Sequence, residues 1–176
     1  MKLDLTEERV RFDFPDAKSL FKFDERDSLS PTYHGAPMKG VDVVAEFSKF
    51  QLWIEIKEYT SEEIQMMKNE GDIRRTDEPH IKSFLTGYFK YKFRDTFLYR
   101  FCEEKVDLPI VYVCLTNFDN TLNVFFRKGL QKQLPTGKAN PKRWKKELIA
   151  KERVFVVDEV AWSRTLASKF GTCERY

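Results

Sequence analysis

The stretch from Gly40 to Tyr59 restricts the fold more than any other part of the chain. Its sequence, GVDVVAEFSKFQLWIEIKEY, predicts two strands at 41–47 and 51–58 that are joined by a short turn. Side chains in a strand alternate between its two faces, so Glu55 and Lys57 are expected to project from the same face.

The polar side chains of this hairpin form a candidate site for a divalent cation. Pairing of the two strands can place Asp42 beside Glu55, with Lys57 close by, while Ile54 and Ile56 face the other way into a core. Hard cations such as Mg²⁺ prefer oxygen ligands, and a bound cation can activate a water molecule. The alternative is an amphipathic hairpin whose charged side chains only face solvent.

Asp42, a gap of twelve residues and then Glu55-Ile56-Lys57 resemble the motif of the PD-(D/E)XK nuclease superfamily, the restriction-endonuclease-like phosphodiesterases. Val41 stands where the motif usually has a proline, which is often missing in this superfamily. The resemblance implies an α/β fold, with a restriction-endonuclease-like mixed central β-sheet flanked by helices on both faces. We expect a single domain over 1–176, with its core at about 15–160.

The resemblance also implies roles for these residues. Asp42, Glu55 and the backbone carbonyl of Ile56 would bind Mg²⁺ or Mn²⁺, and Lys57 would orient the attacking water or stabilise charge. The implied activity is hydrolysis of phosphodiester bonds in nucleic acid, with DNA favoured, by an endonuclease or an exonuclease. Two alternatives stay open: a non-catalytic nucleic-acid-binding or assembly module that retains the fold, and a protein-interaction subunit.

Neighbouring elements supply accessory candidates, namely Asp24, Glu25, Glu46 and Lys82. The first two lie on a helix that is expected to begin at Asp16 and to end before Ser28. The third shares a strand face with Asp42, and the fourth lies in the first turn of a long amphipathic helix at 81–102. His34 can also approach the site. Each of them can equally be an ordinary surface residue.

The rest of the chain continues the alternation of helices and strands. The sequence predicts a strand or extended arm at 1–15, a helix at 61–67, a strand at 108–115, a helix at 121–134, a short basic helix at 142–151, a strand at 153–157 and a helix at 159–170. The last helix is expected to be capped by Asp158 and closed by Gly171.

Two clusters of basic residues are candidates for contacting phosphates. Arg74 and Arg75 lie in a polar segment after the hairpin, and a second cluster comprises Lys142, Arg143, Lys145 and Lys146. The alternatives are ion pairs with nearby acids for the arginines and a solvated helix face for the second cluster.

Composition narrows the class of protein but does not select a partner. Hydrophobic residues make up 41% of the chain and charged residues 34%, which is typical of a soluble globular protein, and the net charge is only +3. No membrane span, signal peptide or disulfide framework is visible, so we expect a cytoplasmic protein without a membrane partner. Specificity in so small a chain could come from a homodimer or a partner protein.

Overall fold

The structure is a computed structural model that describes residues 1–35, 37–69, 81–136 and 143–176. In chain order its elements are β1 (Lys2–Leu5), β2 (Val10–Asp13), β3 (Ser19–Lys22), β4 (Val43–Glu46), β5 (Gln51–Lys57), α1 (Ser61–Asn69), α2 (Ile81–Cys102), β6 (Ile110–Thr116), α3 (Asn120–Gln133), a 3₁₀ turn at Lys151–Arg153, β7 (Val154–Val157), α4 (Glu159–Thr165), α5 (Ala167–Phe170) and β8 (Thr172–Arg175).

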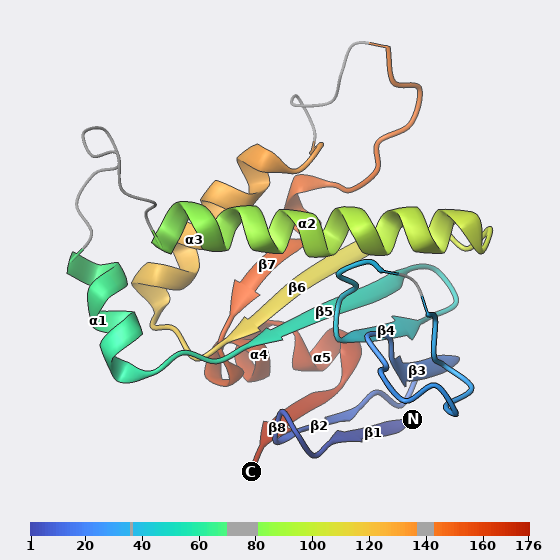
Figure 1. Cartoon of the computed structure of the whole chain (residues 1–176), viewed down its shortest axis with the longest axis horizontal. Helices are drawn as coiled ribbons and strands as arrows, with labels where there is room; N and C mark the ends of the chain where they lie inside the picture. The colour runs from blue at the N-terminus through green and yellow to red at the C-terminus, as the bar shows by residue number, and fades with distance from the viewer. Residues whose placement is uncertain (36, 70–80, 137–142) are drawn as a thin grey trace.

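A mixed five-stranded sheet with the order β3-β4-β5-β6-β7 forms the centre of the molecule (Figure 1). The first three strands pair antiparallel, whereas β6 pairs parallel with β5 and β7 pairs parallel with β6. Parallel neighbours need a long connection, and here α1 and α2 link β5 to β6 while α3 links β6 to β7. The predicted mixed α/β sheet is therefore present.

Helices cover both faces of this sheet because both faces are apolar. All residues of β6 are buried, as are the first six of β5, which is typical of strands covered on both sides. On one face Trp53 packs in a cluster with Phe89 of α2 and Phe126 of α3. On the other, Ile54 and Ile56 pack with residues of α4 and α5, which confirms the predicted direction of both isoleucines.

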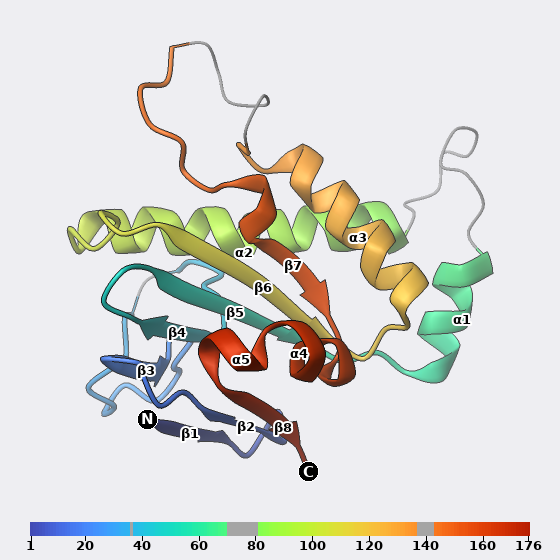
Figure 2. The same cartoon turned by 180° about the vertical axis from the view of Figure 1, so that it is seen from behind.

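A second, antiparallel sheet with the order β1-β2-β8 lies on the same side of the central sheet as α4 and α5 (Figure 2). It pairs Phe12 with Cys173, so it joins the two ends of the chain. Asp158 caps α4 as predicted, because its side chain accepts a hydrogen bond from the Ala161 N–H. The sequence predicted no strand after Gly171, and β8 is a correction to that prediction.

The helix predicted to begin at Asp16 is wrong, because this segment forms β3. Leu20 joins the core on one face of the sheet and Phe21 packs on the other, which is the alternation of a strand. The backbone is paired with β4, and the flanking Lys18 N–H donates to the Glu46 carbonyl. The apolar residues at 20, 21 and 23 fit the periodicity of a helix as well as that of a strand. Pairing with the open edge of β4 stabilises the strand.

The short basic helix predicted at 142–151 is also wrong for the described residues 143–150, which form turns and bends. Ile149 is buried and forms an isolated parallel bridge with Thr136, so this segment is held by a contact with the end of α3. The long helix was predicted correctly: α2 spans 81–102.

Candidate functional site

The antiparallel pairing of β4 and β5 brings Asp42 and Glu55 together. Val43 lies opposite Ile54. Asp42, the residue before Val43, is therefore next to Glu55, the residue after Ile54. Asp42 Oδ2 accepts a hydrogen bond from the Ile56 N–H at 2.5 Å, which fixes the carboxylate beside β5. The Glu55 side chain is only 1% exposed and that of Asp42 is 16% exposed. The two predicted metal ligands are therefore adjacent and largely shielded from water.

Lys92 of α2 reaches into the space between these carboxylates. Its Nζ lies 3.2 Å from Glu55 Oε2, 3.9 Å from Asp42 Oδ1 and 3.5 Å from Asp24 Oδ2. It also donates a hydrogen bond of 2.7 Å to the Gly40 carbonyl, and its side chain is 6% exposed. One ammonium group thus faces three carboxylates, which leaves the cluster with an excess of negative charge when all of its members are ionised.

Lys57 lies on the same side of the sheet as Glu55, as predicted from strand alternation. Its Nζ lies 5.3 Å from the centre of the Tyr88 ring, and Lys92 Nζ lies 5.6 Å from the same ring. An aromatic ring attracts cations through its negative face, so Tyr88 holds both ammonium groups near the carboxylates. Lys57 is less buried than Glu55 and therefore lies at the accessible edge of the site.

Burial and mutual repulsion make the two carboxylates weaker acids than usual. Burial raises the pKa of Glu55 well above its ordinary value, and the nearby Asp42 charge raises it further, against the opposing effect of Lys92. Burial also raises the pKa of Asp42, although Lys92 and the Ile56 N–H oppose this. Burial disfavours the ammonium of Lys92, but Glu55 and Asp42 outweigh that cost and raise its pKa.

The oxygens present suit a hard cation only in part. Among the described residues, no group of three or more His, Cys, Asp or Glu side chains is arranged to hold a metal ion. Asp42 and Glu55 nevertheless offer two carboxylates, and the buried Glu55 Oε2 has no hydrogen-bond partner of good geometry. Mg²⁺ commonly keeps several waters and takes one or two carboxylates. Lys92 is a competitor for the same oxygens.

Of the accessory candidates, Asp24 joins the cluster through its contact with Lys92, although it comes from the bend after β3 and not from a helix. His34 Nε2 lies 3.9 Å from Asp24 Oδ1, at the edge of the cluster. Glu25 is turned into its own loop, where its Oε1 accepts from the N–H groups of Arg26 and Asp27.

The other two accessory candidates lie elsewhere. Glu46, at the far end of β4, forms a short ion pair with the buried Arg100 of α2. Lys82 Nζ lies 5.1 Å from the centre of the Phe125 ring of α3. The role of the Ile56 carbonyl stays a prediction, and the backbone contact that Ile56 makes in the site is the N–H bond to Asp42.

The predicted phosphate contacts are described only in part. Arg74, Arg75 and Lys142 lie outside the described residues. Arg143, Lys145 and Lys146 are exposed on the segment after α3, and Lys146 Nζ donates to the Val106 carbonyl at 3.3 Å.

Sequence reasoning missed Lys92 and Tyr88. A signal for Lys92 existed in the helical period of α2, whose buried positions include Leu85, Phe89, Lys92, Phe93, Thr96 and Arg100. A lysine on the buried face of a helix needs a carboxylate partner on the opposite element, and the hairpin carboxylates were the available ones.

Comparison with protein-family models, curated proteins and solved structures found no match for this chain. None of the helices in the described parts of the chain is long and apolar enough to cross a membrane.

Proposed function

We propose that the protein is a divalent-metal-dependent nuclease that hydrolyses phosphodiester bonds, with DNA as the favoured substrate. The observation that carries the proposal is the placement of Asp42 and Glu55 side by side on β4 and β5, with Lys57 on the same face of the sheet. This arrangement supports the resemblance to the PD-(D/E)XK superfamily, and the order of β3 to β6 is compatible with a restriction-endonuclease-like core.

Each residue of the site would have a separate role in the reaction. Asp42 Oδ1 and Glu55 Oε2 would hold Mg²⁺ or Mn²⁺, while the Ile56 N–H keeps the other Asp42 oxygen in place. When bound, the cation would polarise the scissile phosphate and acidify a water molecule. Lys57, at the accessible edge, would orient that water and stabilise charge on the phosphate.

Lys92 gives the site a second property. Its ammonium favours the ionised forms of Glu55 and Asp42, which a cation requires as ligands. It must also move away from Glu55 Oε2 when a cation approaches that oxygen, because the two positive charges repel each other. We therefore expect Lys92 to set the affinity for the metal rather than to take part in the chemistry.

The second candidate function is a non-catalytic nucleic-acid-binding module. The observation that favours it is the same ion-pair cluster, because Lys92 already neutralises part of the carboxylate charge without any metal. A buried ion-pair cluster of this kind can be a purely structural contact that fixes the packing of α2 on the sheet.

The test is cleavage of single- and double-stranded DNA and RNA with Mg²⁺ or Mn²⁺, combined with calorimetry of metal binding. We expect Lys57→Ala to abolish cleavage but to keep metal binding, and Asp42→Ala to weaken both. The matched control is Lys49→Ala, which removes an exposed lysine from the turn between β4 and β5 and should cleave like the wild type.

Suppose that the folded wild type binds nucleic acid, does not bind metal and shows no metal-dependent cleavage. This result would select the non-catalytic module. Equal cleavage by Lys57→Ala and the wild type would remove Lys57 from the mechanism. An unchanged metal isotherm for Asp42→Ala would remove Asp42 from the metal site.

A further inference from the structure

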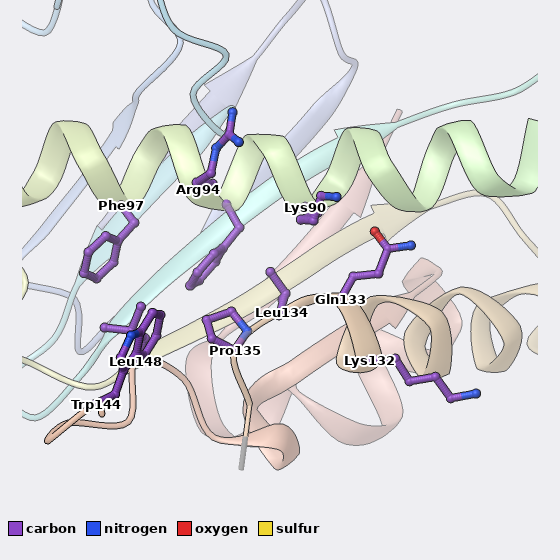
Figure 3. A pocket seen from close by; sticks show the side chains of 10 residues that line it. Lys90, Arg94, Phe97, Lys132, Gln133, Leu134, Pro135, Trp144 and Leu148 are labelled. Atoms are coloured by element: carbon purple, nitrogen blue, oxygen red, sulfur yellow. The ribbon is translucent and has the colours of Figure 1, made fainter. Parts of the chain in front are cut away.

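A cavity of about 350 Å³ lies on another side of α2, away from the carboxylates. It is open to solvent on one side and is lined by α2, by the C-terminal end of α3 with Leu134 and Pro135, and by Trp144 and Leu148 (Figure 3). Its volume is at the lower end of the range for small-molecule sites, so it has room for one small ligand.

The inner lining of this cavity is apolar and rich in rings. Figure 3 shows the Phe97 ring pointing from α2 toward Trp144 and Leu148, with Leu134 and Pro135 beside them. Trp144 is 44% exposed, so part of its ring is accessible at the cavity wall. Flat rings at the wall of a cavity offer surfaces on which another planar group can stack.

The rim has the opposite character and carries only one sign of charge. Lys90 and Arg94 of α2 and Lys132 of α3 line the cavity, and no acid is among its ten lining residues in the described part of the chain. Lys90 Nζ and Arg94 Cζ lie 4.8 and 4.6 Å from the centre of the Tyr91 ring, outside the cavity, and Figure 3 shows Arg94 and Lys132 extending away from Phe97 and Trp144. Arg94 has one acidic neighbour, Asp95, at 3.4 Å, but that residue does not line the cavity. The exposed Arg143 and Lys145 flank Trp144 in the chain and the exposed Glu147 precedes Leu148, so the charge that these three residues add nearby is positive on balance. The long side chains of Lys90, Arg94 and Lys132 would turn toward the cavity to pair with an anion bound there.

We infer that this cavity binds a nucleotide, with the base against Phe97 and Trp144 and the phosphate at Lys90, Arg94 and Lys132. Only a ligand that combines a planar apolar part with a negative group uses both the lining and the rim. Nucleotides have this combination, and base stacking on aromatic residues within a positively charged groove is a general mode of nucleic-acid binding. The nucleotide can be free or one unit of a single strand.

This inference does not depend on the proposed nuclease site. Lys92 and Phe93 are consecutive residues and point about 100° apart around α2, so the carboxylate cluster and the cavity lie on different sides of the helix. Nucleotide binding can thus be measured in EDTA, without metal and without cleavage.

The tryptophans provide a reporter for the cavity. Trp53 and Trp162 are fully buried, whereas Trp144 is exposed at the cavity wall, so quenching by a stacked base should come from Trp144. We would titrate the full chain in EDTA with thymidine monophosphate, with an octamer of thymidine and with inorganic tripolyphosphate. Affinity for the labelled octamer would be measured by fluorescence anisotropy.

We expect one or both nucleotide ligands to quench Trp144, and tripolyphosphate to leave the fluorescence unchanged. Trp144→Ala should weaken binding about tenfold or more, because a stacked base is lost. Trp144→Phe should restore binding without the signal. Lys90→Gln/Lys132→Gln should weaken binding and reduce its salt dependence. The matched control, Lys49→Gln/Lys169→Gln, removes two exposed lysines elsewhere and should bind like the wild type.

Binding of the monophosphate as tight as that of the octamer would assign the cavity to a free nucleotide, and binding of the octamer alone would assign it to a single strand. The inference is overturned if neither ligand quenches Trp144. It is also overturned if Trp144→Ala binds the octamer as the wild type does, or if the two lysine pairs have equal effects. A cavity that serves to dock an apolar side chain of a protein would give these negative results.

Discussion

At the scale of single residues, the raised pKa of Glu55 predicts a specific dependence of stability on pH. A carboxyl group whose pKa is higher in the folded state binds more protons there, so its contribution to stability is present below its unfolded pKa of about 4.3 and is lost as the pH rises through the folded pKa. Each pH unit within that window should cost up to about 1.4 kcal/mol.

The variant Glu55→Gln keeps the shape of the side chain and removes this titration. We therefore expect its free energy of unfolding, measured by urea denaturation, to rise relative to the wild type as the pH increases from about 4.5 toward 8. Asp107→Asn, at an exposed carboxyl group, serves as control and should follow the wild type. A constant difference between Glu55→Gln and the wild type would show that Glu55 titrates normally.

Lys92 is the residue whose loss should disturb the folded state most. Lys92→Met removes the ammonium and leaves Glu55, Asp42 and Asp24 facing one another in a largely buried space. Breaking a buried ion pair by removing one partner typically costs about 3–5 kcal/mol, and we expect a loss of this size at neutral pH. Lys128→Met, on the exposed surface of α3, should change stability by about 0.5 kcal/mol or less.

A double-mutant cycle separates this electrostatic effect from lost packing. The combined variant Glu55→Gln/Lys92→Met should lose less stability than the sum of the two single variants if the ammonium serves to balance the carboxylate. Strict additivity in urea denaturation would mean that the two side chains do not interact in solution.

The candidate site also shows which residues could be predicted from the sequence. Asp42, Glu55 and Lys57 belong to one hairpin, so local alternation and a short turn were enough to bring them together. Lys92 follows Glu55 by 37 residues, and its contact depends on how α2 packs across the sheet. Asp24 was assigned to a helix, yet its proximity to Lys92 results from the pairing of β3 with β4.

At the scale of elements, the two glycines Gly87 and Gly171 predict opposite effects of the same substitution. Gly87 lies inside α2, and a Cβ added there meets no atom within 4 Å. Alanine is a better helix former than glycine, so Gly87→Ala should stabilise the protein by about 0.5–1 kcal/mol. Gly171 has φ 117° between α5 and β8, and a Cβ there would lie 2.1 Å from the Asp13 carbonyl oxygen.

Gly171→Ala should therefore destabilise the protein by roughly 2 kcal/mol or more, because both the backbone conformation and the pairing of β8 with β2 oppose it. Thermal and urea denaturation of both variants provide the measurement. A neutral Gly171→Ala would mean that β8 does not pair with β2 in solution.

The elements differ in how well their sequences determine them. Regular apolar spacing over 22 residues was enough to predict α2 with its observed ends. The four residues of β3 contain too little pattern, and the edge of β4 determines their conformation. Trp144 and Leu148 have helical spacing, yet the described residues around them form no helix. The bridge between Ile149 and Thr136 holds this segment in another conformation.

At the scale of the whole molecule, two buried basic residues anchor α2 across the central sheet. Lys92 binds the carboxylates at one end of β4, and Arg100 binds Glu46 at the other. Both basic residues are buried, so each is expensive to leave unpaired and together they fix the position of the helix. The small sheet β1-β2-β8 could not be predicted from local sequence patterns, because it pairs residues from opposite ends of the chain.

The behaviour of the whole protein toward metal discriminates between the proposed nuclease and a structural role for the cluster. A ligand that binds only the folded state at about 100 times its dissociation constant stabilises it by about 2.7 kcal/mol. For a protein of this size such a gain corresponds to a rise in Tm of roughly 5–10 °C. We expect Mn²⁺ or Mg²⁺ to produce a rise of this kind in the wild type and in Lys57→Ala, but not in Asp42→Asn.

The dependence on pH makes this measurement specific. Cation and proton compete for Glu55 and Asp42, whose pKa values are raised, so the rise in Tm should grow as the pH increases through those values. Ca²⁺ at the same ionic strength tests whether the site selects smaller cations, and NaCl controls for screening. An equal rise in wild type and Asp42→Asn would place the cation elsewhere on the protein, and no rise in a folded wild type would leave the three carboxylates as partners of Lys92 alone.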